Sequence, residues 1–229
     1  MVTRPIRMWI AESPSTRDYQ LILHLCRTRG LRQFLSGNHY DESFYADHVR
    51  LRKGYSKLAD LVFDWATPKS ACDFGCGNGF LLYYLSKKGV AVSGVEGSTA
   101  AFKFMEEEVK SNVFVKDLSE AIDVGKHELV ISTEVAEHLP KRVAPVFVDN
   151  LARTATKKIV FTAARPGQWG DGHINCQPKQ FWIELFATRG WSFDQVSTKT
   201  FRESVRNSPD VCETLPWMTE NFMLFIPRG

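Results

Sequence analysis

The sequence predicts an α/β protein with a mostly parallel seven-stranded sheet, helices on both faces, an antiparallel edge and a helical segment ahead of the sheet. In the middle of the chain, short apolar segments alternate with helical patterns, as in βαβ units, whose crossovers make neighbouring strands parallel. A glycine-rich turn follows the first apolar segment. The 229 residues are 44% hydrophobic and 24% charged, which is typical of a folded chain and excludes a disordered or collagen-like one.

Two helical patterns come first. Apolar residues recur at helical spacing over 16–35, where Gly37 follows, and over 42–65, where Pro68 lies just beyond the end. We therefore expect an N-terminal helical cap at residues 1–66, ahead of a second unit at 67–229.

The rest of the chain predicts the sheet. Expected strands lie at 70–74, 90–95, 113–115, 129–132 and 158–163, with helices at 80–88, 99–110 and 141–152 between them. After a helix at 178–189, two more strands are expected at 192–197 and 221–226. Their short connections favour an antiparallel edge on the otherwise parallel sheet.

Several protein classes are disfavoured by composition. The longest apolar runs, 81–85 and 159–164, are far shorter than the roughly 20 residues that cross a bilayer. Near the N-terminus, Glu12 and Pro14 interrupt any apolar stretch of a secretory signal. Five scattered cysteines make a poor disulfide framework. We expect a cytoplasmic protein with no membrane span, and the sequence gives no oligomeric state.

The net charge of +3 is unevenly distributed. Residues 1–57 contain ten Lys and Arg against five Asp and Glu, whereas the remainder is slightly acidic. Two interpretations stay open: a solvated helix face, or a contact surface for an anionic partner such as RNA.

The strongest local motif is C-D-F-G-C-G-N-G-F at 72–80. Its glycines allow a sharp turn and a close approach of backbone to ligand. It is not the dinucleotide fingerprint, because Phe80 stands where the third glycine is required. Glu96 ends the second expected strand, where its carboxylate can accept hydrogen bonds from ribose hydroxyls. Asp117 and Leu118 follow the third expected strand.

Over residues 68–229 the chain resembles the class I S-adenosylmethionine-dependent methyltransferases, which have a Rossmann-like fold. The segments D-F-G-C-G-N-G, G-V-E-G-S, K-D-L and E-L-V-I-S-T-E-V occur in the family's order and spacing. The resemblance implies that Asp73 and the glycine loop line the methionine end of the cofactor, that Glu96 holds the ribose, and that Asp117 and Leu118 bracket the adenine. The full set of expected cofactor-binding residues is Asp73, Gly75, Cys76, Gly77, Glu96, Gly97, Asp117, Leu118 and Thr133.

The segment E-V-A-E-H-L-P at 134–140 combines two carboxylates and a histidine. If it is helical, Glu134, Glu137 and His138 project from one face and can hold one cation. The alternative is a capped helix start with His138 merely packed.

This segment is similar to that of two methyltransferase subfamilies: the O-methyltransferases of ubiquinone biosynthesis, and the enzymes that methylate the 3′-terminal 2′-hydroxyl of small RNAs. The resemblance implies a divalent cation, Mg²⁺ or Mn²⁺, held by Glu134, Glu137 and His138, with His173 as the candidate fourth ligand. His173 can also be a loop-ordering residue. We expect Glu134, His138 and His173 to be catalytic, through a cation that lowers the pKa of the acceptor hydroxyl, or with His138 or His173 as general base.

The expected function is O-methylation of a small hydroxylated acceptor such as a sugar, phenol or natural product. Tyr40, Phe44, Tyr45 and His48 would close over that acceptor beside Trp169 and Trp182, unless these rings belong to the core. The alternative is RNA 2′-O-methylation of a terminal ribose. A third interpretation is a cofactor-binding protein without catalytic activity.

Overall fold

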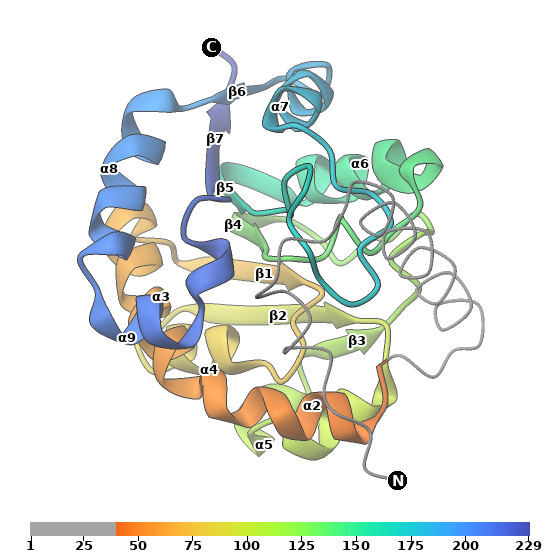
Figure 1. The fold of residues 1–229 in the computed structure, drawn as a ribbon, viewed down its shortest axis with the longest axis vertical. Coiled ribbons are helices and arrows are strands. Elements are labelled where there is room, and N and C mark those ends of the chain that lie inside the picture. Colours follow the sequence, from red (N-terminus) through yellow and green to blue (C-terminus); the bar gives the residue numbers. More distant parts are fainter. Residues whose placement is uncertain (1–39) are drawn as a thin grey trace, which may run out of the picture.

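The structure is a computed structural model that describes residues 40–229. Within this range the chain forms one seven-stranded sheet of order β3-β2-β1-β4-β5-β7-β6 (Figure 1). The strands are β1 Ser70–Phe74, β2 Ala91–Glu96, β3 Val113–Val115, β4 His127–Ser132, β5 Ala155–Phe161, β6 Trp191–Phe193 and β7 Met223–Pro227. The expected helix at 16–35 lies outside the described residues.

Strand direction confirms the predicted fold class. Strands β1 to β5 are mutually parallel, and β7 runs antiparallel to both β5 and β6. From β1 the chain continues to β2 and β3 on one side and then returns to β4 and β5 on the other. In such a sheet the crossovers diverge at the carboxyl ends of the two central strands, here β1 and β4, and leave a crevice for ligands.

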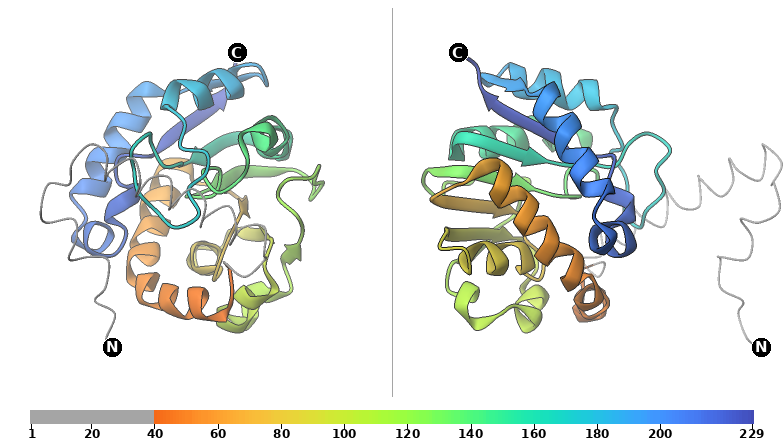
Figure 2. Two further views of the ribbon diagram at one scale, coloured as in Figure 1. Left: turned by 45° about the vertical axis from the view of Figure 1, so that its right-hand side comes forward. Right: turned by 90° about the vertical axis from the view of Figure 1, so that its left-hand side faces the viewer.

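Helices cover both faces of the sheet (Figure 2). One core lies between the sheet and α3, α4, α8 and α9, and the other lies between the sheet and α6 and α7. The α-helices are α2 Glu42–His48, α3 Arg52–Ala66, α4 Phe80–Ser86, α5 Glu107–Lys110, α6 Ala144–Thr154, α7 Lys179–Ala187, α8 Gln195–Arg206 and α9 Pro209–Thr214. The 3-10 helices are η2 Val49–Leu51, η3 Thr99–Phe104, η4 Lys141–Val143 and η5 Pro216–Met218.

Two expected helices are divided in the structure. The pattern at 42–65 forms α2 and α3 with the 3-10 turn η2 between them. The pattern at 99–110 forms η3 and the short α5, because Met105 and Glu106 adopt extended backbone between them.

The predicted strand at 192–197 is wrong after Phe193. Asp194 caps the N-terminus of α8 by accepting a hydrogen bond from the Ser197 amide, and α8 buries only Thr198, Phe201 and Val205. Most positions of α8 are polar, so the sequence offers few apolar residues that mark this segment as packed against the core. The sequence pattern also gave no prediction of α9, which begins at Pro209.

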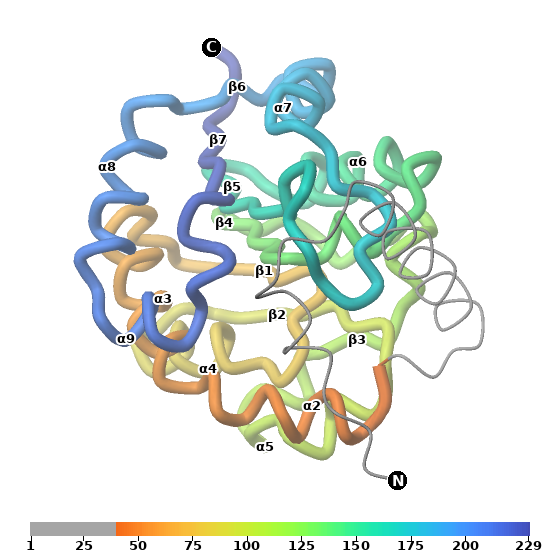
Figure 3. The backbone as a smooth tube through the Cα atoms, viewed as in Figure 1, coloured from red at the N-terminus to blue at the C-terminus, as the bar shows by residue number. Residues whose placement is uncertain are grey.

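The segment at 134–140 is also not helical. Glu134 adopts a left-handed backbone conformation with φ 55°, and the following residues form turns before η4. Figure 3 shows the long connection from β5 to α7, residues 162–178, which returns over the carboxyl end of the sheet, where the segment at 134–140 also lies.

No helix among residues 40–229 is long and apolar enough to cross a membrane. The four cysteines in this range are free thiols. The division of the chain at 66/67 stays a prediction, since α3 shares a hydrophobic core with α4 and the sheet.

Gly54 allows α3 to pack closely on α9. A Cβ at this position would lie 1.9 Å from Thr214 Oγ1 and 3.0 Å from Leu215 Cγ. In an unobstructed helix, replacing Gly with Ala stabilises a protein by about 1 kcal/mol. We expect Gly54→Ala to lower the free energy of unfolding instead, by about 1–3 kcal/mol, because overpacking outweighs the helix propensity. Urea denaturation measures this change, and a stabilised variant would contradict the observed packing.

Candidate functional site

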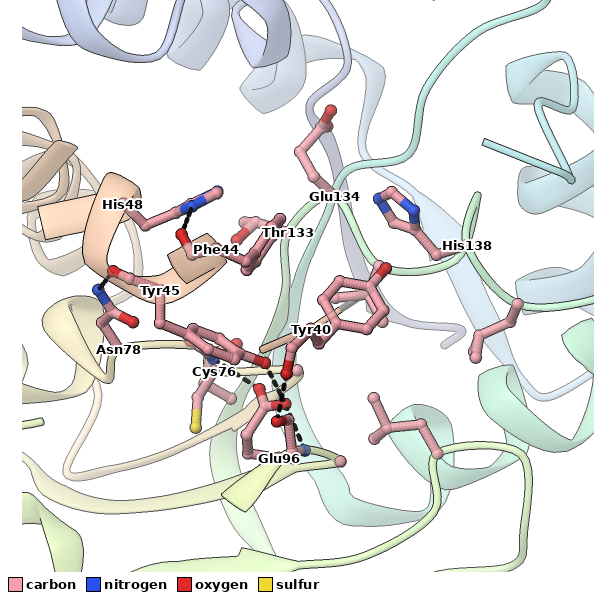
Figure 4. A pocket seen from close by; sticks show the side chains of 18 of the residues that line it. Tyr40, Phe44, Tyr45, His48, Cys76, Asn78, Glu96, Thr133, Glu134 and His138 are labelled. Carbon is pink, nitrogen blue, oxygen red and sulfur yellow. Dashed lines mark hydrogen bonds between the residues drawn. The ribbon is translucent and has the colours of Figure 1, made fainter. Parts of the chain in front are cut away.

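A cavity of about 1010 Å³ lies at the carboxyl ends of β1, β2 and β4. All nine residues that the sequence assigns to cofactor binding line it. Glu134, His138 and His173 line the same cavity, as do Tyr40, Phe44, Tyr45 and His48 from the α2 region (Figure 4). The expected cofactor residues therefore share one space with three of the four predicted metal ligands, whereas the fourth, Glu137, is fully buried and does not line it.

The glycine loop between β1 and α4 is shaped by its glycines. At Gly75, φ is 80° and a Cβ would lie 2.4 Å from Val135 Cγ2, so a side chain cannot be accommodated without movement. At Gly77, φ is 53° and nothing lies within 4 Å of a Cβ, which leaves open space beside the backbone. The backbone amides of Gly75 and Cys76 donate to the Val95 carbonyl at 2.8 and 3.1 Å and hold the loop against β2.

Asp73 places a buried carboxyl group at the end of β1. It is 3% exposed, and its Oδ1 has no hydrogen-bond donor among residues 40–229. Burial raises the pKa of Asp73 to about 8, with a further contribution from the negative charge of Glu96. A buried acceptor of this kind fits a cationic group entering the cavity.

Glu96, at the end of β2, already accepts three hydrogen bonds. Its Oε1 accepts from the Tyr45 hydroxyl at 3.1 Å and from the Ser98 amide at 2.9 Å. Its Oε2 accepts from the Gly77 amide at 2.8 Å. The carboxylate thus joins β2, the glycine loop and α2 at the cavity wall.

The buried carboxylate of Glu137 connects the loop after β4 with the loop after β5. The side chain is fully buried, and its Oε1 accepts from the Ala164 amide at 3.1 Å. Its backbone carbonyl accepts from the amides of Ile174 and Asn175, both at 2.9 Å. Burial and the nearby charge of Glu134 raise the pKa of Glu137 well above its ordinary value. Its Oε2 has no donor within the described part of the chain, so this oxygen fits a proton or a cation.

Three of the four predicted metal ligands lie together. Glu137, His138 and His173 each offer a ligand atom within 4.8 Å of the others, and the two imidazole rings are 5.0 Å apart. Ligand atoms around one ion at about 2.1 Å lie roughly 3 Å apart, so the group would contract to close on a cation. The helical interpretation predicted Glu134, Glu137 and His138 on one face; the observed group has His173 in place of Glu134, and it arises from turns and a second loop.

The tautomer of His173 is set by the backbone. Its Nδ1 lies 3.1 Å from the Gln168 carbonyl, which can only accept, so Nδ1 carries the proton and Nε2 keeps its lone pair. Burial lowers the pKa of His173 and favours this neutral form. A Cβ on Gly170 would lie 2.3 Å from His173 Nε2, so only glycine permits the ring to occupy this place.

Glu134 lies outside this group of three. Its amide donates to Thr162 Oγ1 at 2.8 Å, and its two carboxylate oxygens accept from Asn221 Nδ2 at 3.1 and 3.3 Å. Burial raises the pKa of Glu134. The carboxylate adjoins Glu137 and is held by the segment before β7.

Sequence reasoning missed several residues of the site. Asn221 also donates to Gln168 Oε1 at 3.0 Å, and nothing in the sequence links either residue with Glu134. Asn78 lies inside the glycine motif and its side-chain amide donates to the Tyr45 carbonyl at 2.9 Å, so the motif itself could have indicated it.

Trp169 and Trp182 have different environments. Trp169 is 66% exposed and lines the cavity, as expected of an acceptor wall. Trp182 is fully buried against Phe161 at 5.2 Å between ring centroids, so its predicted place beside the acceptor is wrong.

Residues 72–158 match the protein family described as "Methyltransferase domain". A magnesium protoporphyrin IX methyltransferase of Arabidopsis thaliana is 28% identical over 186 residues, which are 75% of this chain and 55% of that protein. In sequence and in fold the chain therefore resembles the S-adenosylmethionine-dependent methyltransferases. It spans about half the length of this curated relative.

Solved structures of class I methyltransferases share the fold. The magnesium protoporphyrin IX methyltransferase of Synechocystis PCC 6803 with bound S-adenosylmethionine has a TM-score of 0.54 at 18% identity, covering 77% of this chain and 80% of that one. The plantazolicin methyltransferase BpumL has a TM-score of 0.59 at 14% identity, covering 93% and 99%. The resemblance to the ubiquinone and small-RNA subfamilies stays a prediction.

The buried carboxyl of Asp73 gives this protein a pH-dependent stability. Because its pKa is raised in the folded state, Asp73 holds a proton there that it loses on unfolding, and this lowers the free energy of unfolding as pH rises from near 3.8 to about 8. We expect Asp73→Asn, which needs no proton, to equal the wild type near pH 4 and to exceed it in stability at pH 9. Urea denaturation across this range measures the difference, with Asp64→Asn at the exposed end of α3 as control for the loss of one charge. Parallel curves for wild type and Asp73→Asn would contradict the assignment.

Proposed function

We propose that this chain transfers the methyl group of S-adenosylmethionine to a hydroxyl group of a small acceptor, assisted by a divalent cation. The observation that carries this proposal is one cavity of about 1010 Å³ that the expected cofactor residues border together with His138 and His173. Its size suits a cofactor and a small acceptor together.

The cofactor end of the cavity offers matching groups for S-adenosylmethionine. The free Oδ1 of Asp73 is an acceptor for the methionine ammonium, whose positive charge would favour the ionised carboxylate. Open space beside Gly77 admits the ligand close to backbone, and Glu96 is an acceptor for ribose. Asp117 and Leu118 border the same space, where the resemblance puts the adenine.

The cluster of Glu137, His138 and His173 fits a divalent cation. The donor-free Oε2 of Glu137 and the lone pair on His173 Nε2 are the ligand atoms such an ion requires, and the Glu134 carboxylate adds charge beside them. Mixed oxygen and imidazole ligands suit Mg²⁺ or Mn²⁺ better than a structural zinc. A bound cation would supply a lowered pKa for a hydroxyl coordinated to it. Without a cation, His138 or His173 is the candidate base that takes the acceptor proton.

The charge of the cavity favours a small acceptor over RNA. Among the described residues that line the cavity, Lys116 is the one lysine or arginine, and it lies next to Asp117 at the expected adenine end. In the basic segment, Arg52, Lys53 and Lys57 form ion pairs with Glu106, Asp210 and Asp60. A phosphate backbone would have to break these pairs. The relatives named above include enzymes of small molecules, which agrees with this choice.

A transfer assay tests the function directly. Purified protein with methyl-labelled S-adenosylmethionine should label a fraction of a pool of sugars and phenols, but not an RNA pool. We expect His138→Ala to lower the transfer rate at least about a hundredfold while S-adenosylhomocysteine affinity stays within about twofold, because His138 lies at the acceptor end. Unchanged transfer by His138→Ala would contradict its role, and labelled RNA would favour the alternative.

Cation binding is measured separately from activity. Electron paramagnetic resonance titration with Mn²⁺ should show one bound ion per chain, removed by excess EDTA. Gly170→Ala pushes the His173 ring from its place, and we expect about 10- to 100-fold weaker Mn²⁺ binding. His127→Gln, at the opposite end of β4, is the matched control and should bind Mn²⁺ like the wild type. Absence of bound Mn²⁺ in the wild type would contradict the cation site.

A further inference from the structure

The hydroxyl of Tyr45 is the only side chain within residues 40–229 seen to donate to Glu96. Tyr45 is 3% exposed, comes from α2, and lines the cavity next to Glu96 (Figure 4). The other two donors to Glu96 are backbone amides.

The hydrogen bonds of Glu96 limit what it can offer a ligand. A carboxylate has about four acceptor positions, two on each oxygen. Both positions on Oε1 are taken, by Tyr45 and Ser98, and one position on Oε2 is taken by Gly77. Among the hydrogen bonds of residues 40–229, Glu96 therefore has one acceptor position left, although a ribose presents two neighbouring hydroxyls.

The Tyr45 oxygen can supply the missing acceptor. The hydroxyl donates its proton to Glu96 and also interacts with the Ser98 side chain, and one of its two lone pairs is left for a ligand. Burial and the charge of Glu96 raise the pKa of Tyr45, so the group stays a neutral phenol that donates to Glu96.

We infer that Tyr45 is a cofactor-binding residue, and that the ribose of S-adenosylmethionine is held by the Tyr45 hydroxyl and Glu96 Oε2 as a pair. This inference rests on the proposed function, because it names a further residue of the same cofactor site. One ribose hydroxyl donates to Glu96 Oε2 and the other donates to the Tyr45 oxygen.

The backbone around Tyr45 is fixed to the cofactor loops. The Tyr45 carbonyl accepts from Asn78 Nδ2 at 2.9 Å, and the Tyr40 carbonyl accepts from Ser98 Oγ at 2.8 Å. Asn78 belongs to the glycine loop, and Ser98 follows Glu96 at the end of β2. Because the segment is held from both sides, the Tyr45 hydroxyl has a defined place in the site before the cofactor binds.

The same segment forms part of the acceptor end. Tyr40, Phe44 and His48 line the cavity, and the Tyr40 ring lies 6.0 Å from the His138 ring, edge to face. A ribose that engages Tyr45 therefore stabilises the wall that faces His138. Cofactor binding should accordingly reduce the motion of α2.

Calorimetric titration with S-adenosylhomocysteine and its 2′-deoxy and 3′-deoxy forms tests the inference. In the wild type, removal of either hydroxyl should weaken binding. Tyr45→Phe keeps the aromatic ring but removes the hydroxyl that donates to Glu96 Oε1. The acceptor position that this leaves on Oε1 then faces the edge of the ring and not the ribose. We expect Tyr45→Phe to bind S-adenosylhomocysteine about tenfold more weakly than the wild type does. The variant should lose no further affinity when the ligand lacks the ribose hydroxyl that would contact Tyr45.

Tyr84→Phe is the matched control. It removes a hydroxyl that accepts from Arg52 Nε at 2.9 Å, and Tyr84 does not line the cavity, so affinity should stay that of the wild type. If Tyr45→Phe fails to fold, 3-fluorotyrosine placed at position 45 keeps the hydroxyl. The fluorine resonance of this residue should then change its chemical shift when S-adenosylhomocysteine binds. The change should be smaller with the deoxy form that lacks the hydroxyl contacting Tyr45.

The outcomes separate the inference from the proposed function. If the wild type does not bind S-adenosylhomocysteine at all, the proposed function fails. Two results would overturn the inference while the proposed function stands, provided that the wild type binds S-adenosylhomocysteine. In the first, Tyr45→Phe binds it with wild-type affinity. In the second, Tyr45→Phe binds S-adenosylhomocysteine and both deoxy forms more weakly than the wild type by the same factor. A fluorine resonance that does not respond to bound ligand would likewise overturn the inference alone.

Discussion

The buried carboxylate of Glu137 holds together the two loops on which the acceptor end of the site depends. Its Oε1 and its backbone carbonyl accept from Ala164, Ile174 and Asn175, so both ends of the β5–α7 connection are bound to one residue of the β4–η4 loop. Burying a charged carboxylate costs several kcal/mol unless it is paired or protonated. Glu134 beside it increases this cost, and a proton or a cation between the two side chains would offset it.

This arrangement explains how His173 reaches His138. Residues 164–175 leave the sheet and return to Glu137, and this return places the His173 ring 5.0 Å from the His138 ring. Gln168 orients the ring through its carbonyl and links it with Asn221, which holds Glu134. The side chains that would bind a cation are thus positioned by hydrogen bonds from three distant parts of the chain.

The sequence predicted the parts of the site that local chemistry determines. The glycine loop, the acid that ends β2 and all nine positions expected to bind the cofactor line the cavity, because each lies near or after the end of a strand whose carboxyl end is at the same edge. The segment at Glu134 was predicted helical from spacing alone, but its left-handed residue and the Thr162 contact depend on β5. Asn221 reaches the site through a tertiary contact with no local motif, and Tyr45, which was expected at the acceptor, donates to Glu96. Helix α8 was missed because most of its surface is polar.

In the proposed function, one cavity holds the methyl donor, with a cation beside it at the acceptor end. Anomalous diffraction from crystals grown with S-adenosylhomocysteine and Mn²⁺ tests it most directly, because the manganese and the cofactor sulfur are located in one experiment. We expect a manganese peak bounded by Glu137, His138 and His173, with the homocysteine sulfur in the same cavity and the ribose at Glu96. A structure with S-adenosylhomocysteine bound elsewhere, or with manganese at other residues while this cluster stays empty, would contradict the claim.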